Sequence, residues 1–381
     1  MKKIIIVSQS CGYIMTDVIS AFVEKSVEVV FIYGWKTELA GELDSKVKQH
    51  KIIKYNKKNI LTRILTWAIA TVQIYFKLKK YKKADCEVLY VSNPPTSYFV
   101  ASRIKLPFSI LVFDAYPDAL KNVGLKPDSW IYRWWAKKNQ NIFPKAKYIF
   151  TLSEGMKSVL SNYVQTERVK VIPIWSRSEL LCPIEKEKNI FIEQNNLQGK
   201  FIVLYSGNIG YTHNVEAIVD LAQKMKDYDD IVFLIIGDGL KKNMLVESVK
   251  ERNLYNCMFL PFQSVDMLPY SLASADLGIV TLNDTTALLS VPSKTFNLMA
   301  CGVPLLSIAP FSSELSRLIT SYDNGRSFEK DDLDSMVKYI MELKNNTQLK
   351  NNLSENSLNA AKDFTSENAA LFYKYLQGNT K

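Results

Sequence analysis

The chain has 381 residues, enough for two or three domains of about 100–200 residues each. Hydrophobic residues make up 47% and charged residues 23%, which excludes a disordered or collagen-like chain. No apolar run reaches the ~18–20 residues of a membrane span. The five cysteines are scattered without a CxxC pair, and only two histidines are present. This excludes a disulfide framework and a zinc-ligand spacing, and it favours a reducing cytoplasm.

Short apolar runs followed by segments of helical period recur along the chain, a pattern typical of β-α units. In the first half, the runs expected to be strands are 4–7, 27–33, 88–92, 110–113, 148–152 and 169–174. Their Ile, Val and Phe content is typical of strands buried on both faces of a parallel sheet. The N-terminal run IIIV is too short for a signal peptide, so we expect a buried strand there.

A second set of apolar runs begins at residue 201 with FIVLYSG and continues with IVFLIIGDG, CMFLPF, DLGIVTL and VPLLSI. The polar stretch 178–200 between the two sets is expected to be a linker, and the pattern after residue 331 is helical only. We therefore predict an α/β fold with two doubly wound, Rossmann-like domains facing each other across a cleft. A single large α/β domain, or two unrelated domains, are the alternatives.

The net charge of +10 is concentrated between Asp44 and Asp85, where the chain carries twelve Lys or Arg and no Asp or Glu. That segment is +12, which leaves −2 for the rest of the chain. It contains an uncharged run over 64–76, too short to span a membrane and typical of an interfacial helix on an anionic bilayer. A core helix with a solvated lysine tail is the alternative. The residues expected to contact the membrane are Arg63, Trp67, Lys77, Lys79, Lys80, Lys82 and Lys83.

Two strands are expected to end in glycine and lead into a helix, an arrangement that makes anion sites from free backbone N–H groups. They are YSGNIG at 205–210 and IGDG at 236–239. A tight structural turn explains either one equally well. A sharper signal is VPSKTFNLMACGVP at 291–304, where Pro292 and Ser293 favour a helix start and Gly302 its end. Lys294 in the first turn opposes the helix dipole, so we expect it to face an anion; a solvated lysine is the alternative.

These motifs, together with FLPF at 259–262 and ADLGIV at 275–280, resemble the donor domain of GT-B glycosyltransferases. They are most similar to the family 4 enzymes of bacterial capsule and O-antigen assembly, in particular the fucosaminyl-transferase-like group. FDAYPDAL at 113–120 and VIPIWSRSELLCP at 171–183 resemble that group's acceptor-domain and hinge segments. The resemblance implies an acceptor-binding domain over 1–180, a nucleotide-sugar-binding domain over 181–365, and a C-terminal helix over 366–381 that crosses back to the first domain.

The resemblance also implies which residues bind the donor. Lys294 would pair with the diphosphate, Asn297 would reach the ribose, and Phe262 and Gln263 would flank the base. The residues expected at the donor are Gly207, Asn208, His213, Gly237, Asp238, Phe262, Gln263, Ser293, Lys294 and Asn297.

The chain departs from the common family 4 pattern at several positions. Many of those enzymes have an arginine in place of Asn208 and a lysine near His213, and two glutamates where this chain has Leu289 and Asn297. Lys294 could replace part of the missing positive charge. His213 is expected either to hydrogen-bond a phosphate or to be a plain helix-start residue.

In the first half, site residues are expected in the loops at the carboxyl ends of the strands. Those proposed for the acceptor are Ser10, Gly12, Tyr13, Asn93 and Tyr116, and those proposed for catalysis beside Lys294 are Asp114 and Asp118. Either aspartate could orient a hydroxyl of the acceptor or the sugar, or could simply cap a helix. No general base is assigned, because the resemblance implies that the leaving phosphate takes the acceptor proton.

We therefore predict a glycosyltransferase that moves a sugar from a UDP-sugar to a lipid-linked saccharide of the undecaprenyl-diphosphate type, with retention of configuration. Asp229-Asp230 precedes a strand, and no DxD-like pair follows one, so no metal or other cofactor is expected. The protein is expected at the inner face of the cell membrane. The alternatives are a nucleotide-sugar 2-epimerase of the same fold and a non-catalytic basic protein that binds nucleic acid or membrane. A nucleic-acid partner is not expected, because arginines are few in the basic segment.

Overall fold

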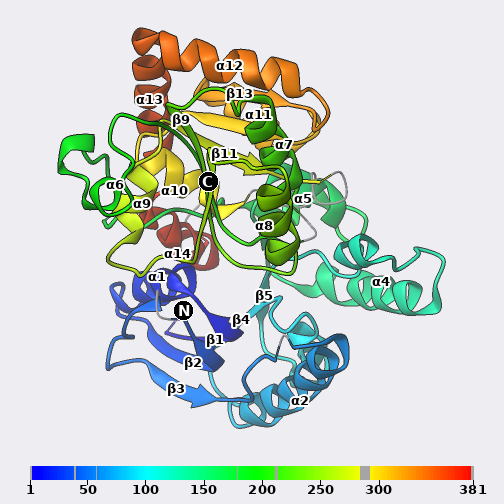
Figure 1. The fold of residues 1–381 in the computed structure, drawn as a ribbon. Coiled ribbons are helices and arrows are strands. Elements are labelled where there is room, and N and C mark those ends of the chain that lie inside the picture. Colours follow the sequence, from blue (N-terminus) through cyan, green and yellow to red (C-terminus); the bar gives the residue numbers. More distant parts are fainter. Residues whose placement is uncertain are drawn as a thin grey trace. The chain divides into compact units, whose positions relative to one another are not determined.

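The structure is a computed structural model that describes residues 2–37, 40–56, 58–177, 179–210, 213–283 and 292–378. The chain divides into two compact units, Met1–Ile174 with Ser366–Lys381, and Trp175–Thr365 (Figure 1). The stretch 178–200, which we expected to be a linker, belongs to the second unit, where it forms the short helix α6 (Ile190–Gln194).

The first unit is built on a seven-stranded parallel sheet with the order β3-β2-β1-β4-β5-β6-β7. Its strands are β1 (Lys3–Cys11), β2 (Glu28–Lys36), β3 (Lys48–Lys51), β4 (Glu87–Val91), β5 (Phe108–Leu111), β6 (Ile149–Thr151) and β7 (Val169–Val171). All the strands expected in this half are confirmed, and β3 was missed. The sequence of β3, KQHK, lacks the buried apolar residues that identify the others, because β3 is an edge strand.

Helices cover both faces of this sheet. They are α1 (Tyr13–Val23), α2 (Ile60–Lys79), α3 (Ala101–Ile104), α4 (Trp130–Ile142), α5 (Glu154–Leu160) and α14 (Ala369–Gln377). Ile5 of β1 belongs to the core that includes Ala70 and Ile74 of α2, and Ile4, which points to the opposite face, is also fully buried. The last helix packs on α1, with the rings of Phe22 and Tyr373 in edge contact 5.8 Å apart.

The second unit is built on a six-stranded parallel sheet with the order β10-β9-β8-β11-β12-β13. Its strands are β8 (Phe201–Ser206), β9 (Ile231–Ile236), β10 (Cys257–Leu260), β11 (Leu277–Thr281), β12 (Leu305–Ile308) and β13 (Gly325–Phe328). The strands expected from the apolar runs are confirmed. The polar edge strand β13, like β3, was missed.

The longer helices of this unit complete its layers. They are α7 (Glu216–Lys224), α8 (Lys242–Glu251), α9 (Leu268–Ala273), α10 (Ser293–Ala300), α11 (Glu314–Tyr322), α12 (Leu333–Asn345) and α13 (Thr347–Ala361). The strand order reverses between β8 and β11, because the chain adds β9 and β10 on one side of β8 and returns to the other side with β11. Such a switch point, at the carboxyl ends of the strands, is where open α/β sheets bind ligands. The two fold predictions, α/β layers and two parallel sheets, are therefore confirmed.

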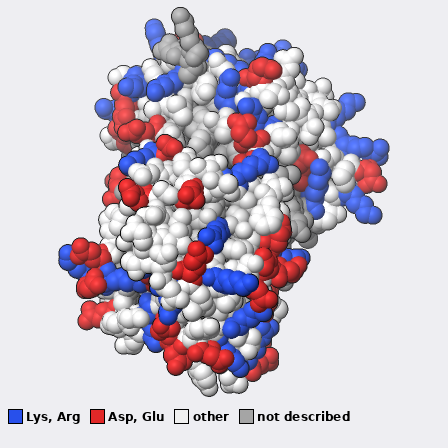
Figure 2. Space-filling view, turned by 90° about the horizontal axis from the view of Figure 1, so that it is seen from above, with Lys and Arg blue, Asp and Glu red and all other residues white. Residues whose placement is uncertain are grey.

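None of the helices in the described part of the chain is both long enough and apolar enough to cross a bilayer. Figure 2 shows one face of the molecule, on which basic and acidic side chains are interspersed.

Candidate active site

The loops that follow β8 and β9 approach each other closely at two glycines, Gly207 and Gly237. Gly207 and Gly237 both have φ of +154°, a backbone conformation that residues with a side chain rarely adopt. A Cβ atom on Gly237 would lie 1.9 Å from the carbonyl oxygen of Gly207. The two loops can therefore approach this closely only because both positions lack a side chain.

Lys294 lies beside this pair of loops. It stands in the first turn of α10, and its Nζ atom lies 3.8 Å from the centroid of the Tyr205 ring. A Cβ atom on Gly207 would lie 2.6 Å from the same Nζ. Nζ is buried, and no atom of the described residues hydrogen-bonds to it. The carboxyl edge of this sheet therefore holds an amine that has lost its hydration and has no anionic partner among the described residues.

Burial lowers the pKa of the Lys294 amine to about 7. The amine therefore carries its full charge at neutral pH only when an anion compensates for the lost water. The lowered pKa argues against the solvated lysine that was the alternative for Lys294, and the expected contact with an anion stays a prediction.

His213 lies near this amine as a neutral ring. Burial, with the Lys294 cation as a second cause, lowers the pKa of His213 to about 4. Its Nδ1 atom lies 3.1 Å from the carbonyl oxygen of Thr281, which only accepts hydrogen bonds. Nδ1 therefore carries the proton, and Nε2 is left with a lone pair. A ring in this state can accept a hydrogen bond from a hydroxyl through Nε2, and the phosphate role considered for His213 stays a prediction.

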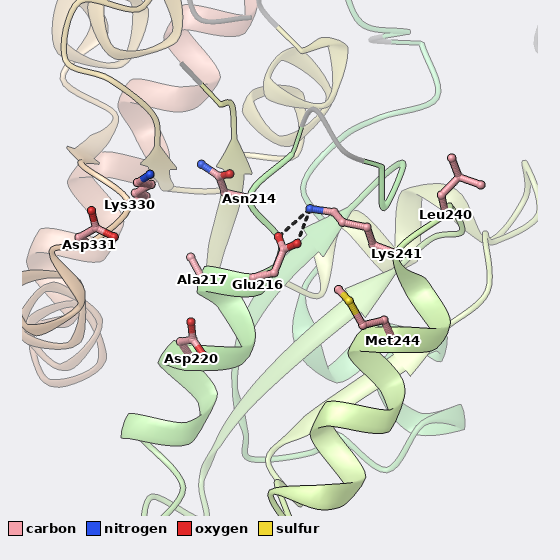
Figure 3. A pocket seen from close by; sticks show the side chains of 9 residues that line it. All are labelled: Asn214, Glu216, Ala217, Asp220, Leu240, Lys241, Met244, Lys330 and Asp331. Atoms are coloured by element: carbon pink, nitrogen blue, oxygen red, sulfur yellow. Dashed lines mark hydrogen bonds and ion pairs between the residues drawn. The ribbon is translucent and has the colours of Figure 1, made fainter. Parts of the chain in front are cut away.

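Lys241 supports the loop that carries His213, a role that was not predicted from the sequence. Its Nζ donates to the carbonyl oxygen of His213 at 2.7 Å and to both carboxylate oxygens of Glu216 at 2.6 Å. This pair lines a hollow of about 620 Å³. In Figure 3, Asn214 and Lys330 lie on the side of Glu216 away from Lys241. A lysine after a glycine turn gives no sequence signal for such a role, because its partners come from another β-α unit.

The other residues expected at the donor lie around the same sheet edge. Asn208 and Asp238 are exposed, and Asp238 accepts the Gly239 N–H through Oδ1 at 2.8 Å. Phe262, just past β10, is 57% exposed. Gln263 Nε2 donates to the carbonyl oxygen of Pro261.

The start of α10 differs from the expectation at one point. Ser293 is the first residue of α10 and does not cap it; Pro292 holds the capping position, and within the described residues no side chain caps this helix. Asn297, one turn further on, is half-buried. Leu289 lies outside the described residues. The uncapped turn leaves helix N–H groups beside Lys294, where both favour an anion.

A second candidate site is a polar cavity of 320 Å³ in the first unit, at the carboxyl ends of β4 and β5. It is lined by Tyr55, Arg63, Trp67, Ser92, Asn93, Pro95, Asp114 and Tyr116. Asn93 and Tyr116 were expected at the acceptor and Asp114 in catalysis, and the structure brings all three together at this cavity. Burial raises the pKa of Tyr116, so its phenol keeps its proton and can both donate and accept hydrogen bonds.

Aromatic rings and one cation form a wall of this cavity. The rings of Tyr55 and Trp67 are stacked with centroids 5.9 Å apart, and Tyr116 meets Trp67 edge-on at 5.8 Å. Arg63 Nε donates to the Tyr55 hydroxyl at 2.9 Å, and its guanidinium lies 5.5 Å from the Trp67 ring. Trp67 Nε1 is buried and has no hydrogen-bond partner among the described residues. Trp67 was expected on the membrane face, which is wrong, because its side chain is only 9% exposed and lines this cavity. Arg63, also expected on the membrane face, is half-buried and lines the same cavity.

Asp118 was expected to be catalytic, and the structure gives it a different role. One carboxylate oxygen accepts from Lys121 and from the Tyr132 hydroxyl, each at 2.7 Å, and the other accepts from the Tyr163 hydroxyl. The side chain is 4% exposed and does not line the cavity. Asp118 therefore ties η3 (Asp118–Val123) to α4, because its carboxylate needs these donors to be buried.

The remaining acceptor residues lie at the end of β1. Ser10 is within β1, Gly12 is the N-cap of α1, and Tyr13 is the first residue of α1. None of these three lines the polar cavity. They share its sheet edge, because the Gln9 N–H donates to the carbonyl oxygen of Asn93 at 2.5 Å.

Residues 186–360, most of the second unit, match the family model of group 1 glycosyl transferases. A protein of Pseudomonas aeruginosa named as a probable glycosyltransferase, WbjE, is 28% identical over 77% of this chain and 74% of its own length. A protein of Escherichia coli K12 named as a colanic acid biosynthesis glycosyl transferase, WcaI, is 30% identical over 46% of this chain and 43% of its own. The chain is a GT-B glycosyltransferase.

Solved structures agree on the fold over the full length of this glycosyltransferase. HepE of Anabaena, solved with UDP and glucose, superposes with a TM-score of 0.76 at 14% identity and covers 100% of both chains. WaaG, a glycosyltransferase involved in lipopolysaccharide biosynthesis, gives a TM-score of 0.71 at 14% identity over 97% of this chain and 99% of its own.

The buried position of Lys294 predicts an unusual titration. In the ligand-free protein its amine should titrate near pH 7, while exposed lysines titrate near their usual value of about 10.4. NMR of 13Cε-labelled lysines measures this, and Lys294→Met identifies the resonance. Because the unfolded chain keeps that proton to higher pH, the free energy of unfolding of the wild type relative to Lys294→Met should rise from about pH 7 to 10. A Lys294 resonance that titrates with the exposed lysines would contradict this account.

Proposed function

We propose that the protein transfers a sugar from a UDP-sugar to a lipid-linked saccharide during the synthesis of a surface polysaccharide, with retention of configuration and without a metal. The observation that carries the donor half of the proposal is the Lys294 amine, which is buried beside Gly207 without a hydrogen-bond partner among the described residues. A buried ammonium is stable when it is paired with an anion, and the diphosphate of a nucleotide sugar supplies one.

In the proposed reaction, the bond between the sugar's anomeric carbon and the β-phosphate oxygen breaks, and its electron pair leaves with the phosphate. The acceptor hydroxyl oxygen forms the new bond to that carbon on the same face of the sugar, and its proton passes to the leaving phosphate. Lys294 and the first-turn N–H groups of α10 would stabilise the negative charge that develops on the diphosphate. One preorganised donor of this kind contributes about 10²–10³-fold to kcat.

The neutral His213 would contact the sugar rather than the phosphates. Its Nε2 lone pair can accept a hydrogen bond from a sugar hydroxyl, and its backbone is held in place by Lys241. The exposed ring of Phe262 offers a surface on which a base can stack. The choice of UDP is supported by HepE, which was solved with UDP and glucose, although that likeness concerns the fold.

We assign the acceptor saccharide to the polar cavity of the first unit. Stacked aromatic rings such as Tyr55 and Trp67 suit the apolar faces of a sugar, while Asn93, Asp114 and Tyr116 offer groups for its hydroxyls. Arg63 adds a cation on the same wall, and a guanidinium pairs well with phosphate oxygens. A saccharide on a lipid diphosphate has both features.

The lipid part of the acceptor requires a membrane surface, and α2 provides a face for it. Thr66, Ala70 and Ile74 are on the buried side of α2, whereas an apolar stripe on the other side is exposed. The large exposed residues of this helix are Ile60, Leu61, Ile64, Leu65, Val72 and Phe76. Lysines follow at its end, with Lys79, Lys80, Lys82 and Lys83 exposed and Lys77 half-buried. An apolar stripe with a basic end favours the anionic inner face of a cell membrane.

The names of the curated relatives support the choice of product. One is named for colanic acid biosynthesis, and WaaG, which shares the fold, is named for lipopolysaccharide biosynthesis. These names support a surface polysaccharide as the product of this chain.

The donor assignment predicts a nucleotide-dependent stabilisation that needs Lys294. In a thermal-shift panel with UDP, GDP, dTDP and CMP, UDP should raise the Tm of the wild type and leave that of Lys294→Met nearly unchanged. Lys250→Met, which removes an exposed lysine from α8, is the matched control and should respond like the wild type. Equal stabilisation of Lys294→Met by UDP would contradict the role of this lysine, and a response to GDP alone would contradict the choice of base.

The reaction itself is tested by turnover. With a panel of UDP-sugars and a saccharide on a short-chain lipid diphosphate, we expect an elongated lipid product and stoichiometric UDP. Turnover should persist in EDTA, because Lys294 and helix N–H groups supply the positive charge, and Lys294→Met should lower kcat at least ~100-fold. Product analysis by mass spectrometry and NMR checks the new linkage. An epimerised nucleotide sugar without acceptor product, or activity that returns only with Mg²⁺ or Mn²⁺, would contradict the proposal.

The acceptor assignment predicts a selective effect of Arg63. Arg63→Gln should raise KM for a water-soluble saccharide diphosphate at least ~10-fold, because one charge-assisted contact is lost, and should leave KM for the donor unchanged. A methyl glycoside of the same saccharide lacks the phosphates, so its KM should not change. Arg133→Gln, an exposed arginine on α4, is the matched control. An equal loss with both acceptors would show that Arg63 does not bind the phosphate.

A further inference from the structure

A second cavity of the first unit lies between α2 and α4 and has a volume of 530 Å³. Its floor and walls are largely apolar, and three of the side chains that form them are also widely exposed. Val72 is 56% exposed, Phe76 58% and Trp134 47%. Covering these exposed side chains with a hydrocarbon chain would remove their apolar surface from water, which is favourable. The cavity can therefore bind an apolar ligand from the surface.

Three cations line the same cavity: Arg103 after η2 (Ser97–Val100), Lys138 on α4, and Lys145 after α4. No Asp or Glu lines it, and within the described residues none of the three cations is in an ion pair. Lys138 lies 6.0 Å from the centre of the Trp134 ring, so cation and apolar wall are adjacent. The cavity therefore combines hydrocarbon contact with an unneutralised positive charge.

We propose that this cavity binds one anionic phospholipid of the bilayer, with its phosphate among Arg103, Lys138 and Lys145 and an acyl chain along Val72, Phe76 and Trp134. The inference rests on the proposed function in one respect, the placement of α2 at a membrane. The ligand is a bilayer lipid rather than the lipid of the acceptor, because the acceptor phosphate already has a cation, Arg63, in the polar cavity. A site of this kind would select the charge of the lipid, which the apolar stripe of α2 alone cannot do.

The two cavities of the first unit are connected through short contacts. Thr71, which lines the lipid cavity, shares a hydrogen bond of 2.6 Å with the hydroxyl of Thr96. Thr96 follows Asn93 and Pro95, which line the polar cavity. A bound lipid would therefore hold α2 and this loop in the arrangement that the acceptor cavity needs.

The test uses the full-length protein and a phosphatidylglycerol with two six-carbon chains, kept monomeric so that no bilayer forms. Native mass spectrometry and calorimetric titration should show one saturable lipid per chain. Binding should weaken at least tenfold in Arg103→Ala/Lys138→Ala and in Phe76→Ala, which alter exposed side chains and should leave the fold intact. The matched control, Lys25→Ala/Lys126→Ala, removes two exposed charges of the first unit outside the cavity and should bind like the wild type.

Three results would overturn the proposal: no saturable binding of the monomeric lipid, equal binding of the corresponding phosphatidylcholine, or equal binding of glycerol phosphate, which has no acyl chain. The UDP thermal shift and transfer to a water-soluble acceptor are measured on the same samples. If the lipid site fails while both of these persist, the proposed transferase function stands; if both are lost in the wild type, it is the proposed function that fails.

Discussion

The second unit depends on one electrostatic constraint, a lysine amine held out of water. Lys294 is placed by the first turn of α10 over the ring of Tyr205, which partly compensates the lost hydration by a cation–π contact. That compensation is incomplete, since the pKa of the amine falls to about 7. The uncompensated cost of removing this amine from water would be recovered when an anion binds to it. Backbone contacts around the amine hold it in this position.

Backbone contacts supply that support. Because Gly207 and Gly237 lack side chains, the loops after β8 and β9 contact each other, and the Nζ atom of Lys294 lies directly against the backbone of Gly207. The amine of Lys241 pairs with the Glu216 carboxylate and donates to the carbonyl oxygen of His213, and it thereby fixes the loop that carries His213. The unit thus contains two buried lysines with opposite situations. One is fully paired and positions the backbone, and the other lacks a hydrogen-bond partner within the described residues.

In the first unit, side chains of the single helix α2 line both cavities and also pack on the core. One side of α2 packs on the core, Arg63 and Trp67 line the polar cavity, and Val72 and Phe76 line the apolar one. A helix can serve three surroundings because successive side chains point in directions about 100° apart. This explains why the basic segment could not be assigned as a whole to one partner. Its arginine and tryptophan serve the polar cavity, and its apolar stripe and most of its lysines remain on the surface.

The sequence alone determined the layers of both sheets, because a strand buried on both faces must be a run of Ile, Val and Phe and cannot be mistaken for polar surface. It missed β3 and β13, whose edge positions remove that requirement. It also identified the glycine turns and Lys294, since a first-turn lysine is costly unless something pairs with it. The sequence could not show which of Asp114 and Asp118 lines a cavity, because both follow the same strand. Only the packing shows that the Asp118 carboxylate accepts hydrogen bonds from two tyrosines and a lysine. Only the tertiary structure decided that Trp67 is buried, that His213 is neutral and that Lys241 supports its loop, because each depends on neighbours from distant β-α units whose direction no local pattern encodes.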